Sequence, residues 1–231
     1  MGLSFNSSFF FYEITVGLSY IPLVALLSVI PLIGGLALGT VLALCRVYHI
    51  RGWEGFAQGY VVVLRSIPLL LQMFLAYFFV KALYTVFGWD QRFLNKLVIV
   101  IFTLTLDAAG VLSEGIRSAL LAVEKGQFEA GYSVGLTGLD IIRHIVIPQS
   151  LPVAVPIVGS VFIGIIKGSS AAYLLGVVEM IQGTAMKTAG NYRYLEAYCA
   201  VALIYWGLTF LVERATWLAE KKVKLYLGGN L

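Results

Sequence analysis

The run from Ile14 to Cys45 contains no charged residue. A helix needs about 20 apolar residues to cross a bilayer, so this run is long enough to span one with a tilt. The composition agrees, because 60% of the 231 residues are hydrophobic and only 12% are charged, with a mean hydropathy of +0.91. A soluble domain has no means of burying that much apolar surface. The sequence therefore excludes a soluble globular protein, a disordered chain and a nucleic-acid-binding protein.

Four further apolar segments follow the first, separated by polar or charged stretches. Because backbone groups in lipid must find their hydrogen bonds within the segment, we expect each segment to be a helix. The sequence predicts an all-α integral membrane protein with five transmembrane helices in a single domain, residues 1–231. The predicted spans cover about residues 14–45, 60–87, 97–121, 153–181 and 197–218, and a charged region at 124–152 separates the third from the fourth.

The distribution of basic residues predicts the orientation. Lys and Arg concentrate in the cytoplasmic loops of membrane proteins. One face of the five-span topology collects nine of them near the span ends, and the other collects five. We therefore expect the N-terminus outside, the C-terminus in the cytoplasm, and region 124–152 on the cytoplasmic side.

The cytoplasmic region 124–152 has the pattern of two short helices. Gln127 to Gly135 is typical of one helix, and Thr137-x-x-Asp140 is a capping-box pattern that begins another. Pro148 and Pro152 are expected to end the second helix. An amphipathic helix at the membrane surface and a docking element for another protein fit this pattern equally well.

The same region contains a spaced motif: Glu129-Ala130-Gly131, three residues, Gly135, nine residues, Ile145, one residue, Ile147-Pro148. This motif resembles the EAA signature of ABC importer permeases. The family pattern is Glu-Ala-Ala, three residues, Gly, nine residues, Ile, one residue, Leu-Pro. The departures are Gly131 for Ala and Ile147 for Leu. Likeness to the polar-amino-acid subfamily extends over most of residues 14–218, including Arg65-Ser66-Ile67-Pro68 and Ser113 to Arg117.

The resemblance implies a permease subunit of a polar-amino-acid ABC importer in a bacterial-type inner membrane. Such a subunit pairs with a second permease, binds two cytoplasmic ATPase subunits and receives its amino acid from an extracytoplasmic binding protein. The sequence has no P-loop pattern, so this chain is expected to be no enzyme and to hold no cofactor, with ATP and Mg on the partner ATPase. The residues expected to couple it to that ATPase are Glu129, Ala130, Gly131, Gly135, Ile145 and Pro148.

Ionisable side chains inside the spans are costly and mark functional candidates. Asp107 and Lys167 lie deepest in the predicted spans, and either pair with each other or face a cavity. The expected substrate path consists of these two with Ser169, Ser170 and Tyr173, because Gly168 and the two serines favour a local unwinding. Arg65, Glu114 and Arg117 are expected to be structural or gating residues, with Glu114 and Arg117 pairing on one helix face. The two histidines lie far apart, so we expect no metal site.

Two other functions remain open from the residues alone. Asp107, Glu114 and Glu179 are possible members of a proton relay in a secondary transporter, although no inverted repeat is detectable. A membrane scaffold without transport is the third reading. The stretch from Tyr192 to Glu213 is similar to importers of cystine and other sulfur amino acids, so these are the candidate substrates.

Overall fold

The structure is a computed structural model that describes residues 5–228, and all regular structure in this range is helical. Several helices are short pieces joined end to end by turns. The elements are α1 (Ser7–Leu18), α2 (Ile21–Val47), α3 (Trp53–Ser66), α4 (Leu69–Val86), η1 (Gln91–Phe93), α5 (Lys96–Leu121), α6 (Lys125–Ser133), α7 (Gly138–Ile141), η2 (Ile142–Val146), α8 (Ile147–Ser169), η3 (Ser170–Leu175), α9 (Met180–Thr188) and α10 (Tyr194–Tyr226).

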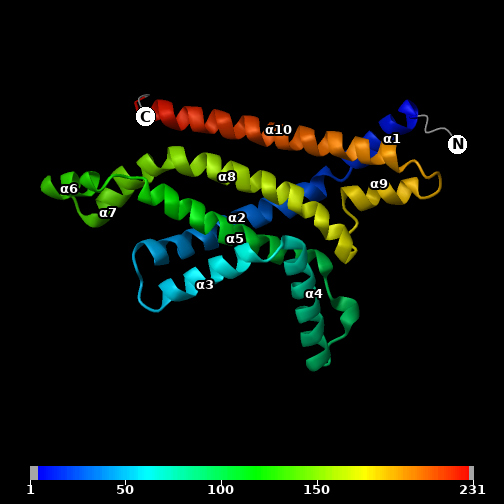
Figure 1. The fold of residues 1–231 in the computed structure, drawn as a ribbon, viewed down its shortest axis with the longest axis horizontal. Coiled ribbons are helices and arrows are strands. Elements are labelled where there is room, and N and C mark those ends of the chain that lie inside the picture. Colours follow the sequence, from blue (N-terminus) through cyan, green and yellow to red (C-terminus); the bar gives the residue numbers. More distant parts are fainter. Residues whose placement is uncertain (1–4, 229–231) are drawn as a thin grey trace.

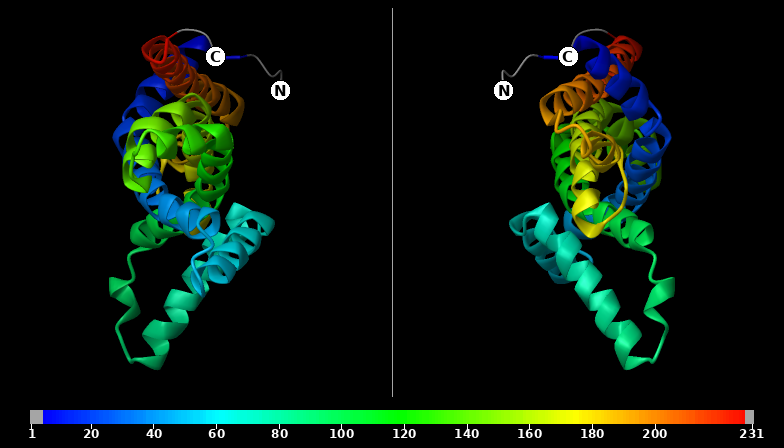
Figure 2. Two further views of the ribbon diagram at one scale, coloured as in Figure 1. Left: turned by 90° about the vertical axis from the view of Figure 1, so that its left-hand side faces the viewer. Right: turned by 90° about the vertical axis from the view of Figure 1, so that its right-hand side faces the viewer.

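The predicted fold class is confirmed. Five helices are long and apolar enough to cross a membrane, namely α2, α4, α5, the continuous helix from Gly138 to Leu175, and α10. α2, α5, α8 and α10 run lengthwise beside one another, whereas α4 turns away from them (Figure 1). The end-on views show the four long helices as a bundle, with α3 and α4 projecting from one side of it (Figure 2). The α6–α7 pair lies at one end of this bundle, and α1 and α9 lie at the other.

Glycine brings α2 and α5 into close contact at the centre of the bundle. A Cβ atom on Gly35 would lie 2.8 Å from the Cβ of Ala108, and one on Gly39 would lie 3.0 Å from the carbonyl oxygen of Ala109. Small residues allow helices in lipid to pack by close backbone approach. The main buried cluster continues from this crossing through Leu27, Met73, Leu104 and Leu112, so the core joins α2, α4 and α5.

The ends of the first and fourth spans differ from the prediction. The segment from 14 to 45 is two helices, α1 and α2, because Pro22 in the first turn of α2 begins a new helix. The segment from 153 to 181 does not unwind at Gly168. α8 continues to Ser169, tightens into the 3₁₀ helix η3, and ends at Gly176, whose φ is +80°.

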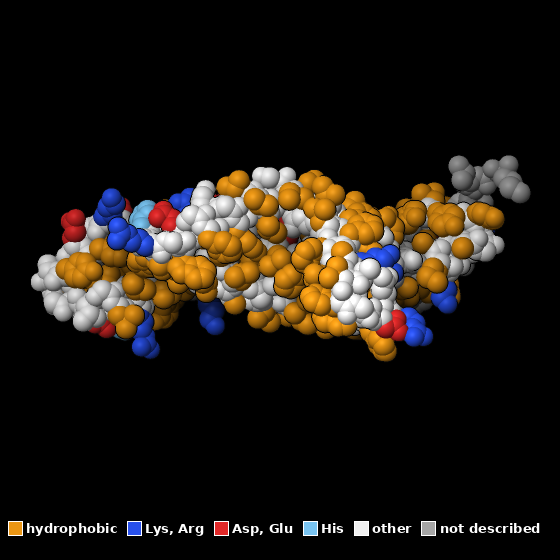
Figure 3. Space-filling model, turned by 90° about the horizontal axis from the view of Figure 1, so that it is seen from below, with side chains coloured by type: hydrophobic (Ala, Val, Ile, Leu, Met, Phe, Trp, Pro, Cys, Tyr) orange, Lys and Arg blue, Asp and Glu red, His pale blue; other side chains and the backbone are white. Residues whose placement is uncertain are grey.

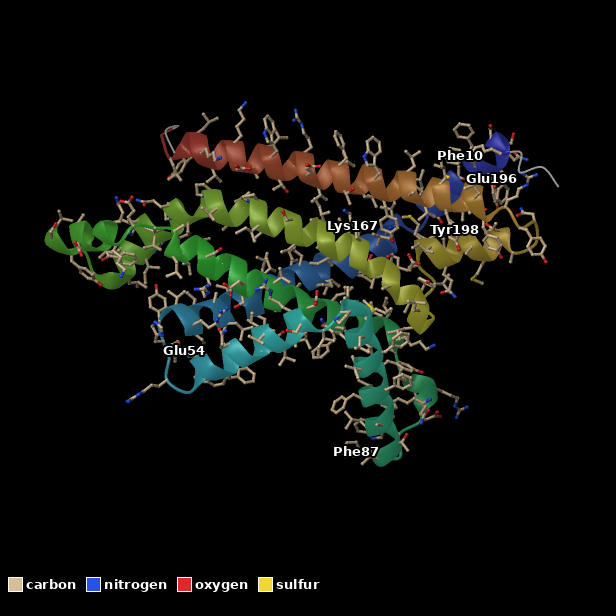
Figure 4. All side chains as sticks on the ribbon, viewed as in Figure 1. Phe10, Glu54, Phe87, Lys167, Glu196 and Tyr198 are labelled. Atoms are coloured by element: carbon tan, nitrogen blue, oxygen red, sulfur yellow. The ribbon has the colours of Figure 1, made fainter. Side chains whose placement is uncertain are left out.

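The second span is broken where the sequence predicts one helix from 60 to 87. α3 ends at Ser66 and α4 begins at Leu69. A residue before proline avoids helical geometry, and Ile67 has φ −98° and ψ 127°. Pro68 therefore turns the chain, and the apolar helix α4 leaves the bundle with Phe87 at its far end (Figure 4).

Candidate functional site

A cavity of about 310 Å³ lies where α4, α5 and α8 meet. Its lining is largely apolar, with Asp107 of α5 and Ser160 of α8 as polar members and Gly164 beside them. Pockets of this kind, apolar with a few convergent polar groups, are the usual form of a small-molecule site. Asp107 therefore faces a cavity, which is one of the two arrangements that the sequence left open.

Asp107 also holds the break in the second span. The Nε2 atom of Gln72 lies 2.8 Å from Asp107 Oδ1, 2.8 Å from the carbonyl oxygen of Ile67 and 2.9 Å from that of Leu64. Gln72 is buried on the first turns of α4, so one amide ties the end of α3, the Pro68 turn and α5 together. Gln72 was not among the residues predicted from the sequence, where its signal is an amide within the mostly apolar segment of α4.

The other residues predicted for the substrate path lie outside the cavity lining. Lys167 is exposed near the end of α8 remote from the α6–α7 pair (Figure 4), and within residues 5–228 the ion pairs do not join it to Asp107. The hydroxyls of Ser169 and Ser170 donate to the carbonyl oxygens of Ile166 and Lys167 in their own helix. Tyr173 is exposed on η3. Asp107 is thus the predicted residue that reaches this cavity.

Glu114 joins two helices through two arginines. Its Oε1 accepts from Arg117 on the same helix, as predicted, with 3.1 Å to Arg117 Nε. Its Oε2 lies 2.8 Å from Nη1 of Arg46 at the end of α2, a side chain that is only 9% exposed. Arg65 is exposed on the last turn of α3, one turn from the Pro68 break. The ion pair fixes the ends of α2 and α5 next to the α6–α7 pair.

The α6–α7 pair forms a helical hairpin, which folds around its own small apolar core. Val123, Ile141 and Val146 are buried together, with Phe128, Leu136 and Ile145 packed on them. Gly131 is buried because a Cβ there would lie 2.7 Å from Cγ1 of Ile141. Gly131 and Ile145 therefore pack within the hairpin, and their expected part in coupling to an ATPase stays a prediction.

Other residues of the signature lie on the outside of this hairpin. Glu129 and Ala130 are exposed, and exposed Tyr132, Val134 and Leu139 surround them. Gly135 has φ +81°, a left-handed conformation that glycine adopts without strain, and turns the chain between α6 and α7. The hairpin presents an acidic residue among apolar side chains, which is a surface suited to another protein.

The second helix of the hairpin does not end at the prolines. The predicted capping box of Thr137 and Asp140 begins it, and from Gly138 the helix continues to Leu175. Residues Ile142–Val146 form a turn of π-helix, in which Ile147 N–H bonds to the carbonyl of Ile142. A π turn shifts the bonding pattern by one residue, so Pro148 enters the helix where no donor is required of it. The second helix of the hairpin is therefore continuous with α8.

A buried acidic residue at the opposite end of the bundle was not predicted. Glu13 of α1 is fully buried, and within the described range neither carboxylate oxygen has a hydrogen-bond partner. Burial raises the pKa of Glu13, an effect that the Lys187 ammonium opposes. Glu179 is also fully buried; it accepts from Gln182 N–H at the start of α9 and from the Tyr205 hydroxyl. The signal in the sequence was that Glu13 is the first charge before a long apolar run.

Comparison with known proteins identifies the family. Residues 35–225 match the family described as "binding-protein-dependent transport system inner membrane component". The chain belongs to this family. It is 32% identical over 223 residues to the probable amino-acid ABC transporter permease protein PatM of Vibrio harveyi, covering 96% of this chain and 97% of PatM. It is 33% identical over 207 residues to the L-cystine transport system permease protein TcyL of Bacillus subtilis strain 168, covering 89% and 86%.

A solved structure supports the same assignment. The crystal structure of an amino acid ABC transporter with histidines contains a chain that superposes on this permease with a TM-score of 0.82. The two are 26% identical, and the match covers 96% of this chain and all of the other. The prediction of an importer permease is thereby confirmed. The chain is a transport subunit of a bacterial-type inner membrane, and it acts with an ATPase and a substrate-binding protein rather than as an enzyme by itself.

Proposed function

We propose that this permease carries a polar amino acid into the cytoplasm, with cystine or another sulfur amino acid as the first candidates. The single observation that carries the proposal is the placement of Asp107 in a cavity between three helices, in a chain that is similar to permeases of amino-acid transporters. The cystine candidate rests on the similarity to TcyL.

The cavity supplies groups that a zwitterion needs. The carboxylate of Asp107 is an acceptor for an ammonium group, and the hydroxyl of Ser160 is able to donate to a carboxylate. A charged residue in a span is retained where it faces such a path. We place the substrate between α5 and α8, with Asp107 on one wall and Ser160 on the other.

The hairpin is the proposed contact with the ATPase. Glu129 and Ala130 would lie in the interface, and the continuous helix through the π turn would carry motion of the hairpin into α8, which lines the cavity. Alternating access would then follow from rigid-body rocking of α5 and α8. Two ATPase subunits would bind and hydrolyse ATP with Mg, one for each permease.

The second permease would pack on α4. This helix is apolar but leaves the bundle with Phe78, Phe79 and Val86 exposed, and the Asp107 cavity lies at its base. Apolar side chains cover the middle of the face seen in Figure 3, and the basic ones gather toward the two ends. We orient the hairpin and the end of α10 toward the cytoplasm and α1 and α9 toward the outside.

Uptake into proteoliposomes tests the function. The permease, its cognate ATPase and its binding protein are reconstituted, and labelled cystine, glutamine and methionine are offered with internal ATP. Asp107→Asn should reduce uptake by at least tenfold, because an amide keeps the bond to Gln72 but loses the charge. The matched control is Asp90→Asn at the start of η1, outside both the cavity and the α6–α7 pair. Uptake by Asp107→Asn equal to wild type would exclude the proposed substrate site.

Labelling of single cysteines tests the orientation. Cys45 and Cys199 are first replaced by Ser, and a cysteine is then placed at Asn191 or at Leu225. An impermeant maleimide should label the first variant in intact cells and the second only after lysis. The reverse pattern would invert the proposed topology.

A proton relay finds no support in the arrangement of its three candidates. Asp107 accepts from Gln72, Glu114 is held by two arginines, and Glu179 caps α9. The three carboxylates therefore make three separate sets of contacts, two from different turns of α5 and one at the start of α9. Uptake driven by a proton gradient without ATP would reverse this conclusion.

A further inference from the structure

A second, apolar groove is more than twice as large as the Asp107 cavity, and the transport mechanism does not use it. It has a volume of about 700 Å³ and is lined by four helices, with Leu36 of α2, Leu120 of α5, Val155 of α8 and Val212 of α10 among its walls. It runs along α8 on the hairpin side of the bundle, between α8 and α10, which lie side by side (Figure 1).

The groove offers almost nothing polar to a ligand in its depth. The hydroxyl of Thr40 donates to the carbonyl oxygen of Leu36, that of Ser150 to Ile147, and that of Thr216 to Val212. Each hydroxyl is thus satisfied by its own helix. A zwitterionic amino acid would lose its hydration here without compensation, so this groove is unsuited to the transported substrate.

The dimensions fit a hydrocarbon chain. The lining on α8 extends from Ile147 to Phe162, which is about 22 Å at the rise of an α-helix. One leaflet of the hydrocarbon core is about 15 Å thick. The groove therefore passes through the full depth of one leaflet.

The hairpin end of the groove carries a positive charge. A smaller hollow of about 260 Å³ shares Leu151 with the groove and is lined by Lys222 and Tyr226. Lys221 instead stacks on Trp217, 5.3 Å from the ring centroid, and Lys224 pairs with Glu220 at 2.8 Å. Within residues 5–228 the salt bridges leave Lys222 without an acidic partner. A basic group at the mouth of an apolar groove between helices complements an anionic headgroup.

We propose that this groove binds one anionic phospholipid of the cytoplasmic leaflet. An acyl chain lies between α8 and α10, and the phosphate meets Lys222. The lipid fills the space between the helix that carries the hairpin and α10, so it supports the element through which the ATPase would act.

Lipid retention by the purified transporter complex tests the site. The complex is exchanged into mixed phosphatidylglycerol and phosphatidylethanolamine nanodiscs, returned to detergent, and its bound lipids are counted by native mass spectrometry. Lys222→Gln should lower the preference for phosphatidylglycerol by about fivefold, the factor expected for one basic residue near an anionic surface. Lys221→Gln, on the neighbouring position of the same helix, should keep the wild-type preference. Equal retention by both variants would overturn the headgroup assignment.

The acyl chain is tested separately. Ala154→Trp places an indole in the groove and should reduce retention of both lipids, and unchanged retention would overturn the proposal. Since this variant can fail to assemble, the wild-type complex is also illuminated with phosphatidylglycerol that carries a diazirine in its acyl chain. Crosslinks should fall on Val155 and Val212. Labelling no greater there than on exposed Leu211, or occupation of the groove by a second copy of the chain, would overturn the proposal.

Discussion

At the scale of single residues, Gln72 holds the break in the second span. Its side-chain nitrogen lies within hydrogen-bond distance of three acceptors, on α3, in the Pro68 turn and on α5, so we expect Gln72→Leu to destabilise the protein. The cost should be about 1–3 kcal/mol, the penalty of buried polar groups left without partners. Thermal unfolding in detergent measures it, with Gln58→Leu on the exposed face of α3 as the control. Equal stability of the two variants would mean that Pro68 alone maintains the break.

Glu114 is the second residue whose replacement should destabilise a contact between helices. Glu114→Gln leaves Arg46, which is almost buried, without its counter-charge, and we expect a loss of about 1.5–3 kcal/mol. Arg46→Met combined with Glu114→Leu removes both charges and should recover most of that loss, because paired removal avoids an uncompensated charge. A double-mutant cycle on unfolding free energy checks the coupling. Additive effects would show that the pair at 2.8 Å contributes nothing jointly.

At the scale of elements, the α2–α5 crossing depends on the absence of a side chain. Gly35→Ala places a methyl group 2.8 Å from the Cβ of Ala108, a distance that forces the helices apart. We expect a loss of about 1–3 kcal/mol from overpacking. Gly59→Ala in α3 has nothing within 4 Å, so it should be neutral or stabilising by up to about 1 kcal/mol. The two variants are compared by thermal unfolding, and similar melting temperatures would contradict the close approach.

Different residues of the hairpin are expected to determine its stability and its coupling to the ATPase. Gly131→Val crowds Ile141 within the hairpin core, so we expect it to destabilise the hairpin by about 1–3 kcal/mol and to increase proteolysis there. Glu129→Lys lies on the exposed side and should leave proteolysis unchanged while lowering ATP-driven uptake. Limited proteolysis and uptake are measured on both. A Glu129→Lys variant with normal uptake would remove Glu129 from the proposed interface.

The sequence predicted which segments are helical more accurately than it predicted where each helix begins and ends. Long apolar runs determine which segments cross the membrane, and the Thr137–Asp140 box marks the start of α7 correctly. The sequence did not decide which prolines end a helix, because the effect of a proline depends on the hydrogen-bond pattern around it. Pro68 breaks a span, whereas Pro148 lies within a continuous helix directly after a π turn. No residue pattern in the sequence predicts that π turn. The Asp107 cavity was predictable as a buried charge, but the partners Gln72 and Ser160 depend on how helices far apart in the sequence pack.

At the scale of the whole molecule, the two ends of the bundle are built differently. The end next to the α6–α7 pair carries ion pairs and an exposed hairpin. The other end is closed by α1, α9 and α10, where Gly17 lies against Ile204, Met180 and Thr184, and the Asn6 N–H donates to Glu196 at 2.9 Å. Figure 4 shows Glu196 beside α1. Two carboxyl groups, Glu13 and Glu179, are fully buried at this closed end.

This closed end should make the stability of the permease depend on pH. Burial raises the pKa of Glu13 above its ordinary value of 4.5, so between pH 4.5 and the raised pKa the folded protein retains a proton that the unfolded chain has released. The stability from this group is fully present below pH 4.5 and is lost as the pH rises through the raised pKa.

Glu13→Gln keeps the shape but cannot ionise, so its melting temperature should fall less between pH 5 and pH 8 than that of the wild type. Some dependence should remain, because burial also raises the pKa of Glu179. Glu129→Gln, exposed on the hairpin, is the control. Parallel melting curves for Glu13→Gln and the wild type would show that α1 opens to water when Glu13 ionises, and that the closed end is not one packed unit.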